Sequence, residues 1–147
     1  MSRNYSQRYD NEISYFAMNP ENRPLITKTD IKGNIIFTNN IFRKITGYSK
    51  EELTGKPHSI VRHPDMPKAI FEEMWNHILN KKKWYGYLKN KTKDGKTYWT
   101  EVVIEPLIDE NGNIEAFMSY QKFVKHNIKK LYNHNYKILK LKEVVSN

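Results

Sequence analysis

The chain has 147 residues, a hydrophobic content of 38% and a formal net charge of +9, which fit a single domain with one core. It contains no cysteine, so a disulfide framework, a thiolate metal site and a catalytic thiol are excluded. It has no long apolar run and no hydrophobic leader, and we therefore expect a cytoplasmic protein without direct membrane insertion.

The positive charge lies mainly in three groups of lysines, at residues 81–83, 89–96 and 122–130. Such a surplus can attract nucleic acid, anionic lipid or an acidic protein, or it can simply solvate turns and sheet edges. No glycine-rich phosphate loop, zinc-ligand spacing or helix-turn-helix pattern accompanies the lysines. We therefore predict no nucleic-acid partner.

The first part of the chain predicts a helix and then a hairpin. Residues 5–18 carry apolar side chains at helical spacing, namely Tyr5, Tyr9, Ile13 and Phe16. Residues 25–30 and 35–38 are strand-like and flank a turn that contains Gly33.

Two short helices and a stiff loop are expected next. Residues 39–47 predict a helix closed by Gly47, and Ser49 with Glu52 forms a capping-box pattern for a second helix. Residues 57–67 contain three prolines and predict a rigid, non-helical loop. The longest central helix, residues 68–82, should present one apolar face made of Ile70, Phe71, Met74, Trp75 and Ile78.

Three strands joined by tight turns complete the domain. They are predicted at residues 84–92, 97–107 and 114–123, and the turns between them contain Asp-Gly and Asn-Gly pairs. Together with the earlier hairpin and the short helices, they indicate an α+β domain built on an antiparallel sheet.

Residues 124–145 are expected to be helical. An apolar residue recurs every seven positions, at Val124, Leu131, Ile138 and Val145, which resembles a short coiled-coil stripe. We divide the chain into an N-terminal helical cap (1–19), a core domain (20–124) and a C-terminal helix (125–147). That helix either transmits a signal or forms a homodimer, or it folds back on its own sheet; the stripe favours the first two.

The proline-rich loop holds Arg62, His63 and Asp65 in fixed directions just before a helix. A rigid loop with a cationic donor at a helix start can bind an anionic ligand. A polar surface connection with solvated charges explains the same residues equally well.

Several motifs resemble the PAS domain family. The segments T-N-N-I-F at 38–42 and T-G-Y-S-K-E-E-L-T-G-K-P-H at 46–58 are similar to the general PAS signature. The segment R-H-P-D-M-P at 62–67 resembles, more specifically, the PAS domain of bacterial aerotaxis receptors. The resemblance covers about residues 20–124. It implies a PAS fold, with a five-stranded antiparallel sheet, short helices on one face and flanking N- and C-terminal helices.

This resemblance implies non-covalently bound FAD and a redox or energy sensor of the aerotaxis type. The residues that it assigns to the cofactor site are Asn39, Arg62, His63, Asp65, Trp84 and Asn90. The residue types suit that chemistry. Asn90 can donate and accept hydrogen bonds near the flavin N5 atom, and Phe71, Trp75 and Trp84 offer flat apolar walls.

Ordinary structural roles compete with these assignments. Trp75 and Trp84 can be core aromatics, and Asn90 can satisfy a sheet edge. Asn39 stands at a predicted helix start, where capping is the usual role of asparagine.

The resemblance also implies a partner. Aerotaxis receptors carry a membrane anchor and a methyl-accepting region that this sequence lacks. We therefore expect a separate membrane-bound, methyl-accepting chemotaxis-type signalling protein to read its output, with a homodimer through the terminal helices as a further expectation. The lack of cysteine excludes the flavin–cysteine adduct of light-sensing relatives.

Two alternative functions stay open. One is a haem-binding PAS gas sensor, for which His77 is the candidate axial ligand, and the other is a cofactor-free interaction module. The sequence shows no paired carboxylates, nucleophile motif or metal constellation, so we predict that the protein is not an enzyme.

Overall fold

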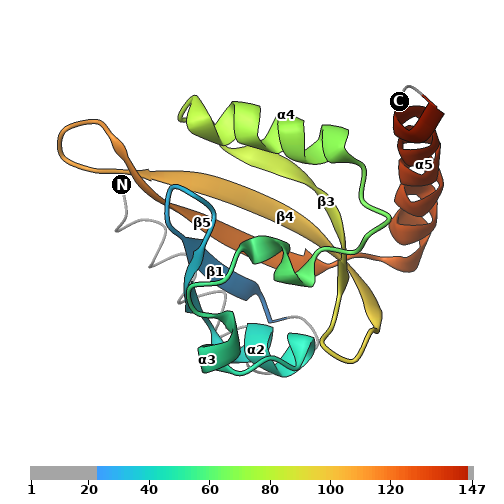
Figure 1. Cartoon of the computed structure of the whole chain (residues 1–147), viewed down its shortest axis with the longest axis horizontal. Coiled ribbons are helices and arrows are strands. Elements are labelled where there is room, and N and C mark those ends of the chain that lie inside the picture. The colour runs from blue at the N-terminus through green and yellow to red at the C-terminus, as the bar shows by residue number, and fades with distance from the viewer. Residues whose placement is uncertain (1–22, 146–147) are drawn as a thin grey trace.

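The computed structural model describes residues 23–145, so the helix predicted at residues 5–18 lies outside the described residues. The described chain forms a five-stranded antiparallel sheet with strand order β2-β1-β5-β4-β3. Figure 1 shows the helices arranged around this sheet, with α4 lying along it and α5 standing at one end. The α+β class and the antiparallel sheet predicted from the sequence are confirmed.

The predicted hairpin is formed by β1 (Leu25–Thr29) and β2 (Ile35–Thr38). Its turn is organised by Asp30, whose carboxylate accepts hydrogen bonds from the backbone N–H groups of Lys32 and Asn34, both at 2.9 Å. The turn is closed by Gly33 at a φ of +87°, a conformation that glycine adopts without strain.

The two short helices also form as predicted. The first, α2 (Asn40–Thr46), ends at Gly47, which is left-handed. The second, α3 (Lys50–Leu53), has a complete capping box, because Ser49 and Glu52 each accept a hydrogen bond from the other's backbone N–H.

The prediction that residues 57–67 are wholly non-helical is wrong over four residues. His58–Val61 form a single 3-10 turn, η2. Pro57 stands just before the turn, and none of its four residues is a proline or precedes one, so the proline restrictions do not reach them. Beyond η2 the chain is non-helical as far as Pro67.

The central helix, α4 (Lys68–Leu79), ends three residues earlier than predicted. Asn80 already leaves the helical region, and Lys81 follows with a φ of +62°. The predicted apolar face is confirmed, since Met74 and Ile78 are buried and its other members pack against the same core.

The last three strands are β3 (Trp84–Lys91), β4 (Thr97–Ile108) and β5 (Ile114–Phe123). Their antiparallel register sets Leu88 opposite Thr100 and Val102 opposite Gln121. Because side chains alternate between the faces of a strand, one face of this sheet points toward α4. We call it the inner face; it carries Leu88, Asn90, Thr100, Ser119 and Gln121.

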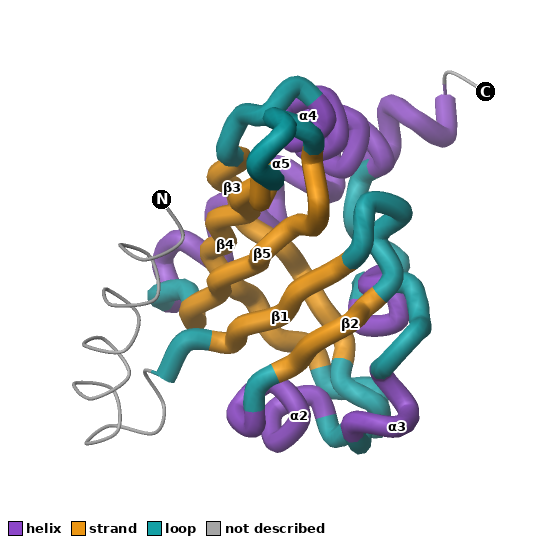
Figure 2. Tube along the Cα trace, turned by 90° about the vertical axis from the view of Figure 1, so that its left-hand side faces the viewer, coloured by secondary structure: helices purple, strands orange, loops and turns teal. Residues whose placement is uncertain are grey.

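The C-terminal helix, α5 (His126–Val145), packs against the opposite, outer face beside β3 and β4. The ring of the buried Tyr136 lies 5.7 Å from that of Trp99, and Tyr132 lies 4.1 Å from Tyr87. Figure 2 shows α4 and α5 together at the β3 end of the sheet. Within residues 23–145 no helix has both the length and the apolar character needed to cross a membrane.

Candidate functional site

A cavity of about 230 Å³ lies between the inner face of the sheet, α4 and the segment that contains η2. Its apolar wall comes from α4 and the strands. The residues of that wall are Phe71, Met74, Trp75, Ile78, Leu88, Ile104 and Phe117. Its polar lining comes from the sheet, at Asn90, Ser119 and Gln121, and from His58. The exposed Lys32 and Arg62 also line it, and we call the opening beside them the mouth.

A continuous chain of buried polar side chains crosses three strands at the base of this cavity. The Asn90 amide donates to the Thr100 hydroxyl at 3.4 Å, and that hydroxyl donates to the Gln121 carbonyl at 2.8 Å. The Gln121 amide then donates to Ser119 at 3.1 Å. Buried polar groups are costly unless they are paired, so this network holds each amide in one orientation.

Arg62 stands at the mouth of the cavity. Its guanidinium carbon lies 3.5 Å from the centre of the Phe71 ring, a cation–π contact with α4. Partial burial lowers the pKa of Arg62. Among residues 23–145 no carboxylate forms an ion pair with it, so its donors remain available to an anion.

Backbone pairing connects the mouth of the cavity to its base. Arg62 and Asn90 form an isolated antiparallel bridge, and the His63 N–H donates to the Lys89 carbonyl at 3.2 Å. The segment that carries the cation is thus fastened to the edge of the strand that carries the buried amide.

His58 lies between these groups. Its Nε2 atom is 2.9 Å from the Thr27 hydroxyl, and its ring lines the cavity. Burial, with a smaller contribution from the charge of Arg62, lowers the pKa of His58 to about 4. The imidazole is therefore neutral at physiological pH and adds no charge to the mouth.

Trp75 closes the cavity on the side of the first hairpin. A Cβ atom on Gly33 would lie 3.3 Å from the Trp75 ring, so the hairpin turn rests on the indole. The same indole meets Phe117 edge-on, with 5.8 Å between the ring centres.

Four of the expected site residues therefore line one cavity: Arg62, Phe71, Trp75 and Asn90. The other four, Asn39, His63, Asp65 and Trp84, lie outside its lining.

Asn39 is a structural clamp. Its side-chain oxygen accepts hydrogen bonds from the N–H groups of Phe42 and Ile26, at 3.0 and 3.1 Å, and its amide donates to the Pro24 carbonyl. The first of these bonds is the helix cap considered from the sequence. The other two join the start of α2 to β1 and to Pro24, the residue just before that strand.

His63 and Asp65 face β3 and α5. Asp65 accepts a hydrogen bond from Lys89 at 3.0 Å, and Lys89 also donates to Asn133 of α5 at 3.1 Å. The bond from Lys89 lowers the pKa of Asp65. His63 accepts from the Asp65 N–H, and burial lowers its pKa.

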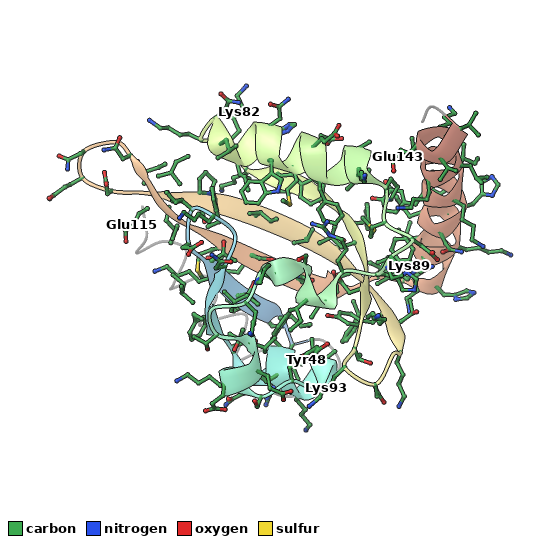
Figure 3. All side chains as sticks on the ribbon, viewed as in Figure 1. Tyr48, Lys82, Lys89, Lys93, Glu115 and Glu143 are labelled. Atoms are coloured by element: carbon green, nitrogen blue, oxygen red, sulfur yellow. The ribbon has the colours of Figure 1, made fainter. Side chains whose placement is uncertain are left out.

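Further contacts join the proline-rich segment and α4 to α5. Lys140 donates to the Met66 carbonyl at 3.4 Å, and Glu143 accepts from the Ala69 N–H at 2.9 Å. Figure 3 labels Lys89 and Glu143 on this side of the molecule. The segment after Arg62 therefore links the mouth of the cavity to the C-terminal helix.

Trp84 is held between α4 and the β3 strand. Its indole N–H donates to Glu73 at 3.2 Å, and its ring lies over Gly86, where a Cβ atom would come within 2.3 Å of it. It lines a second, more open groove of about 640 Å³ that includes Tyr87, Tyr132 and Tyr136.

His77, the axial ligand considered for haem, does not line the inner cavity. Its Nδ1 atom is 2.8 Å from the Glu73 carbonyl of its own helix. No cluster of three or more potential metal ligands occurs among the described residues.

Five residues of this site were not predicted from the sequence, namely Thr100, Ser119, Gln121, His58 and Lys32. A signal for part of this set exists in β5, where Ser119 and Gln121 alternate between Phe117 and Phe123 on one face. Two polar residues in an otherwise apolar inward row indicate a buried polar site.

The profile of the PAS fold family matches residues 35–121, which is more than half of the chain. The chain therefore belongs to the PAS fold family. Within that family it is similar to the aerotaxis receptor of Escherichia coli K12, with 41% identity over 95 residues. That match covers 65% of this chain and 19% of the receptor.

A nitrogen fixation regulatory protein of Klebsiella oxytoca is 31% identical over 108 residues, which cover 74% of this chain and 22% of that protein. The chain thus spans about a fifth of the length of these two relatives. It is a PAS sensor domain related to both.

Solved structures agree on the fold. A PAS domain from Colwellia psychrerythraea aligns with a TM-score of 0.64 and 29% identity, covering 69% of this chain and 86% of that one. The light-state LOV domain of the blue-light photoreceptor aureochrome1 aligns with a TM-score of 0.68, covering 84% of this chain and 96% of its own. At 23% identity the second comparison shows the fold alone.

Proposed function

We propose that this domain binds FAD in the inner cavity and reports the redox state of the flavin to a signalling partner. The observation that carries the proposal is the buried chain of amides and hydroxyls from Asn90 to Ser119, which lies at the base of a cavity with an apolar wall. A planar heterocycle with polar edges requires both kinds of surface. The relationship to the aerotaxis receptor supports the same ligand class.

The size of the cavity supports a bound ring system and not a wholly enclosed dinucleotide. Its volume of about 230 Å³ is below the roughly 300 Å³ at which sites for drug-sized ligands begin. The ring would occupy the cavity, and the diphosphate would extend past the mouth.

The mouth provides the charge that such a diphosphate needs. Arg62 and Lys32 both line it. An arginine fork can bind phosphate oxygens through two hydrogen bonds at once. We therefore assign Arg62 to the phosphates, with Lys32 as a second cation, and Phe71 and Trp75 to the walls around the ring.

The remaining expected residues would then act by positioning others. Asp65 and His63 fix the segment that carries Arg62, Asn39 clamps α2 to the sheet, and Trp84 fills the space between α4 and β3. Each assignment follows from the hydrogen bonds described above.

The flavin, when bound, would supply the chemistry of accepting and releasing electrons together with protons. The protein would detect that change through Asn90 and Gln121, because a new donor or acceptor on the flavin would favour the turned orientation of an amide over the one that the network holds. Such a turn would alter the side-chain hydrogen bonds through Thr100, which connect β3, β4 and β5. Because β3 contacts α5 through Lys89 and Tyr87, α5 would transmit the change.

For the output we propose a separate membrane-bound, methyl-accepting chemotaxis-type signalling protein as the partner. Energy taxis in the cytoplasm would be the physiological setting. A partner can be controlled only if it binds the two redox states with unequal affinity.

The first test is the absorption spectrum of the purified chain, with heat release and chromatography of any bound compound. Flavin bands and released FAD are expected. A Soret band would replace the proposal with haem, and a spectrum of tryptophan and tyrosine alone, even after FAD is added, would leave a cofactor-free module.

A second test addresses the mechanism. Hydrogen exchange of α5 should differ between the oxidised and the reduced protein, and Asn90→Leu should remove most of that difference while FAD stays bound. Asn76→Leu, at an exposed position of α4 outside the cavity, is the matched control. If the exchange of α5 still differs between the oxidised and reduced forms of the Asn90 variant as it does in the natural chain, Asn90 does not transmit the redox change to α5.

A further inference from the structure

The helix α5 presents two separate faces. Its inward face makes the contacts with the domain, through Tyr132, Asn133, Tyr136, Lys140 and Glu143. The Tyr136 hydroxyl, for example, donates to the Tyr87 carbonyl at 2.7 Å. These residues are three, four or one apart, as expected for one side of a helix.

The outward face carries an apolar stripe that the domain leaves exposed. Leu131 is 52% exposed, Ile138 42% and Leu141 65%, and Val145 lies at the end of the same line. Leu131, Ile138 and Val145 are seven residues apart and Leu141 is three beyond Ile138, which is the a and d spacing of a coiled-coil seam. We call these four residues the outer stripe.

The positions beside the outer stripe are basic or neutral. Lys130 and Lys137 flank one side, and Asn135 and Lys142 flank the other. The one acidic residue of α5 is Glu143, which faces α4 and binds the Ala69 N–H.

This charge pattern argues against a second copy of α5 as the occupant. In a self-paired coiled coil the flanking positions of one helix face those of the other. A second copy would offer no carboxylate to Lys130 or Lys137 in either orientation.

The shape of the outer stripe argues for a helix and against a lipid surface. Helices that lie in a membrane interface have a broad apolar face with tryptophan, phenylalanine or leucine. Here the aromatic residues of α5, Tyr132 and Tyr136, face the domain, and the exposed stripe is an aliphatic line that widens only at its end, where Val144 is 66% exposed beside it.

We infer that the outer stripe is a docking site for an amphipathic helix of another protein, with aliphatic residues at its a and d positions and glutamate or aspartate beside them. Apolar burial along the seam would supply the affinity, and the carboxylates facing Lys130 and Lys137 would set the choice of partner. His134, a polar residue within the seam, would help to fix the register.

The inference rests on the proposed function in one respect only, namely that the docked partner receives the redox signal. The docking itself needs no flavin. The flavin content of each preparation is therefore measured separately from its binding to the partner.

The test uses the whole chain and two labelled synthetic helical peptides of four heptads with the same aliphatic seam. One peptide has glutamate at every e and g position and the other has lysine there. Fluorescence anisotropy should detect micromolar binding of the glutamate peptide alone, weakened at high salt. Ile138→Ser should reduce that affinity at least tenfold. Ile31→Ser, at a residue of the β1–β2 turn that is 52% exposed where Ile138 is 42% exposed, should leave it unchanged.

Other results would overturn the inference. Sedimentation as a dimer that Ile138→Ser dissociates would assign the outer stripe to a second copy. Stronger retention on phosphatidylglycerol vesicles than on the glutamate peptide would assign it to lipid. Equal binding of both peptides, or binding of neither, would reject an acidic helix as the partner of the outer stripe. One result would separate the two proposals. If the protein binds the glutamate peptide but takes up no flavin even after FAD is added, the docking site is supported and the redox sensor is rejected.

Discussion

The guanidinium carbon of Arg62 lies over the Phe71 ring, 3.5 Å from its centre, while the backbone of Arg62 pairs with that of Asn90. One residue thus contacts the helix α4, the strand β3 and the mouth of the cavity. This placement restricts the directions in which the guanidinium can donate hydrogen bonds.

A prediction about ligand choice follows from that restriction. Arg62→Gln should weaken FAD binding by about tenfold to a hundredfold, the value of one or two charge-assisted hydrogen bonds. The same substitution should hardly change the affinity of the protein for riboflavin, which has no phosphate. Titration calorimetry with both ligands gives the comparison. Arg43→Gln, a change at an arginine of α2 that does not line the cavity, serves as the control, and an equal loss for both ligands would contradict the assignment.

A second prediction concerns pH. Burial lowers the pKa of His58 to about 4 from its ordinary value of 6.5, so between these values the unfolded chain binds the proton more strongly than the folded one. The free energy of unfolding should therefore fall as the pH decreases from 6.5 to 4, by at most about 3 kcal/mol from this residue. Urea titrations at several pH values should show a flatter profile for His58→Gln. The exposed His134→Gln should keep the slope of the natural chain.

The close approach of Trp84 to Gly86 gives a third prediction. Gly86→Ala would place a methyl group within 2.3 Å of the indole ring unless one of them moves, and should destabilise the fold by about 1–3 kcal/mol. Trp84→Leu removes the ring, so the two changes combined should cost less than the sum of the single costs. Chemical denaturation of all four proteins measures that coupling. If the costs of the two single changes simply add in the double variant, the β3 strand must move to avoid contact between the new methyl group and the indole.

The bond between Lys89 and Asp65 leads to a fourth prediction. Asp65→Asn leaves Lys89 with Asn133 but removes its ionic partner, and amides of α5 near residue 133 should exchange up to about fivefold faster. Asp94→Asn, which removes the charge beside Lys96 in a distant turn, should not change them.

The same contact predicts a pH response in the natural chain. Since Lys89 lowers the pKa of Asp65, the stabilising charge is fully present above the ordinary value of 3.8. It is lost as the pH falls below 3.8, so α5 should lose protection against exchange, relative to the intrinsic rate at each pH, only there. A loss of protection already at pH 5 would indicate that another group is responsible.

The features that the sequence predicted correctly have local causes. The capping box of α3 depends on Ser49 and Glu52 alone, and the apolar face of α4 depends on spacing within one helix. The hairpin turn at Gly33 similarly depends on residues that are close in the chain. The resemblance also assigned Arg62 and Asn90 to one cofactor site. Both line the inner cavity, and their role toward a cofactor stays a prediction.

The features that the sequence did not predict depend on contacts between distant segments. The polar chain from Asn90 to Ser119 requires the register of three strands. The placement of Asp65 against Lys89 depends on how the proline-rich segment meets the sheet edge. The sequence also could not decide which face of α5 meets the sheet, because the helix carries two apolar faces. Tyr132 and Tyr136 bind the domain, and of the predicted stripe Val124 is buried while Leu131, Ile138 and Val145 stay exposed.

The bridge between Arg62 and Asn90 has one further consequence. If the cavity binds FAD as proposed, Arg62 holds the phosphates of the ligand and Asn90 contacts its ring. The backbones of these two residues are paired with each other. A ligand without phosphates would make no contact with Arg62, and its ring would be held less firmly against Asn90. The domain would then respond more weakly to the redox state of that ring, even if the ring itself can be reduced. The domain would then act as a coincidence detector, responding only when an intact dinucleotide and a change in its oxidation state occur together.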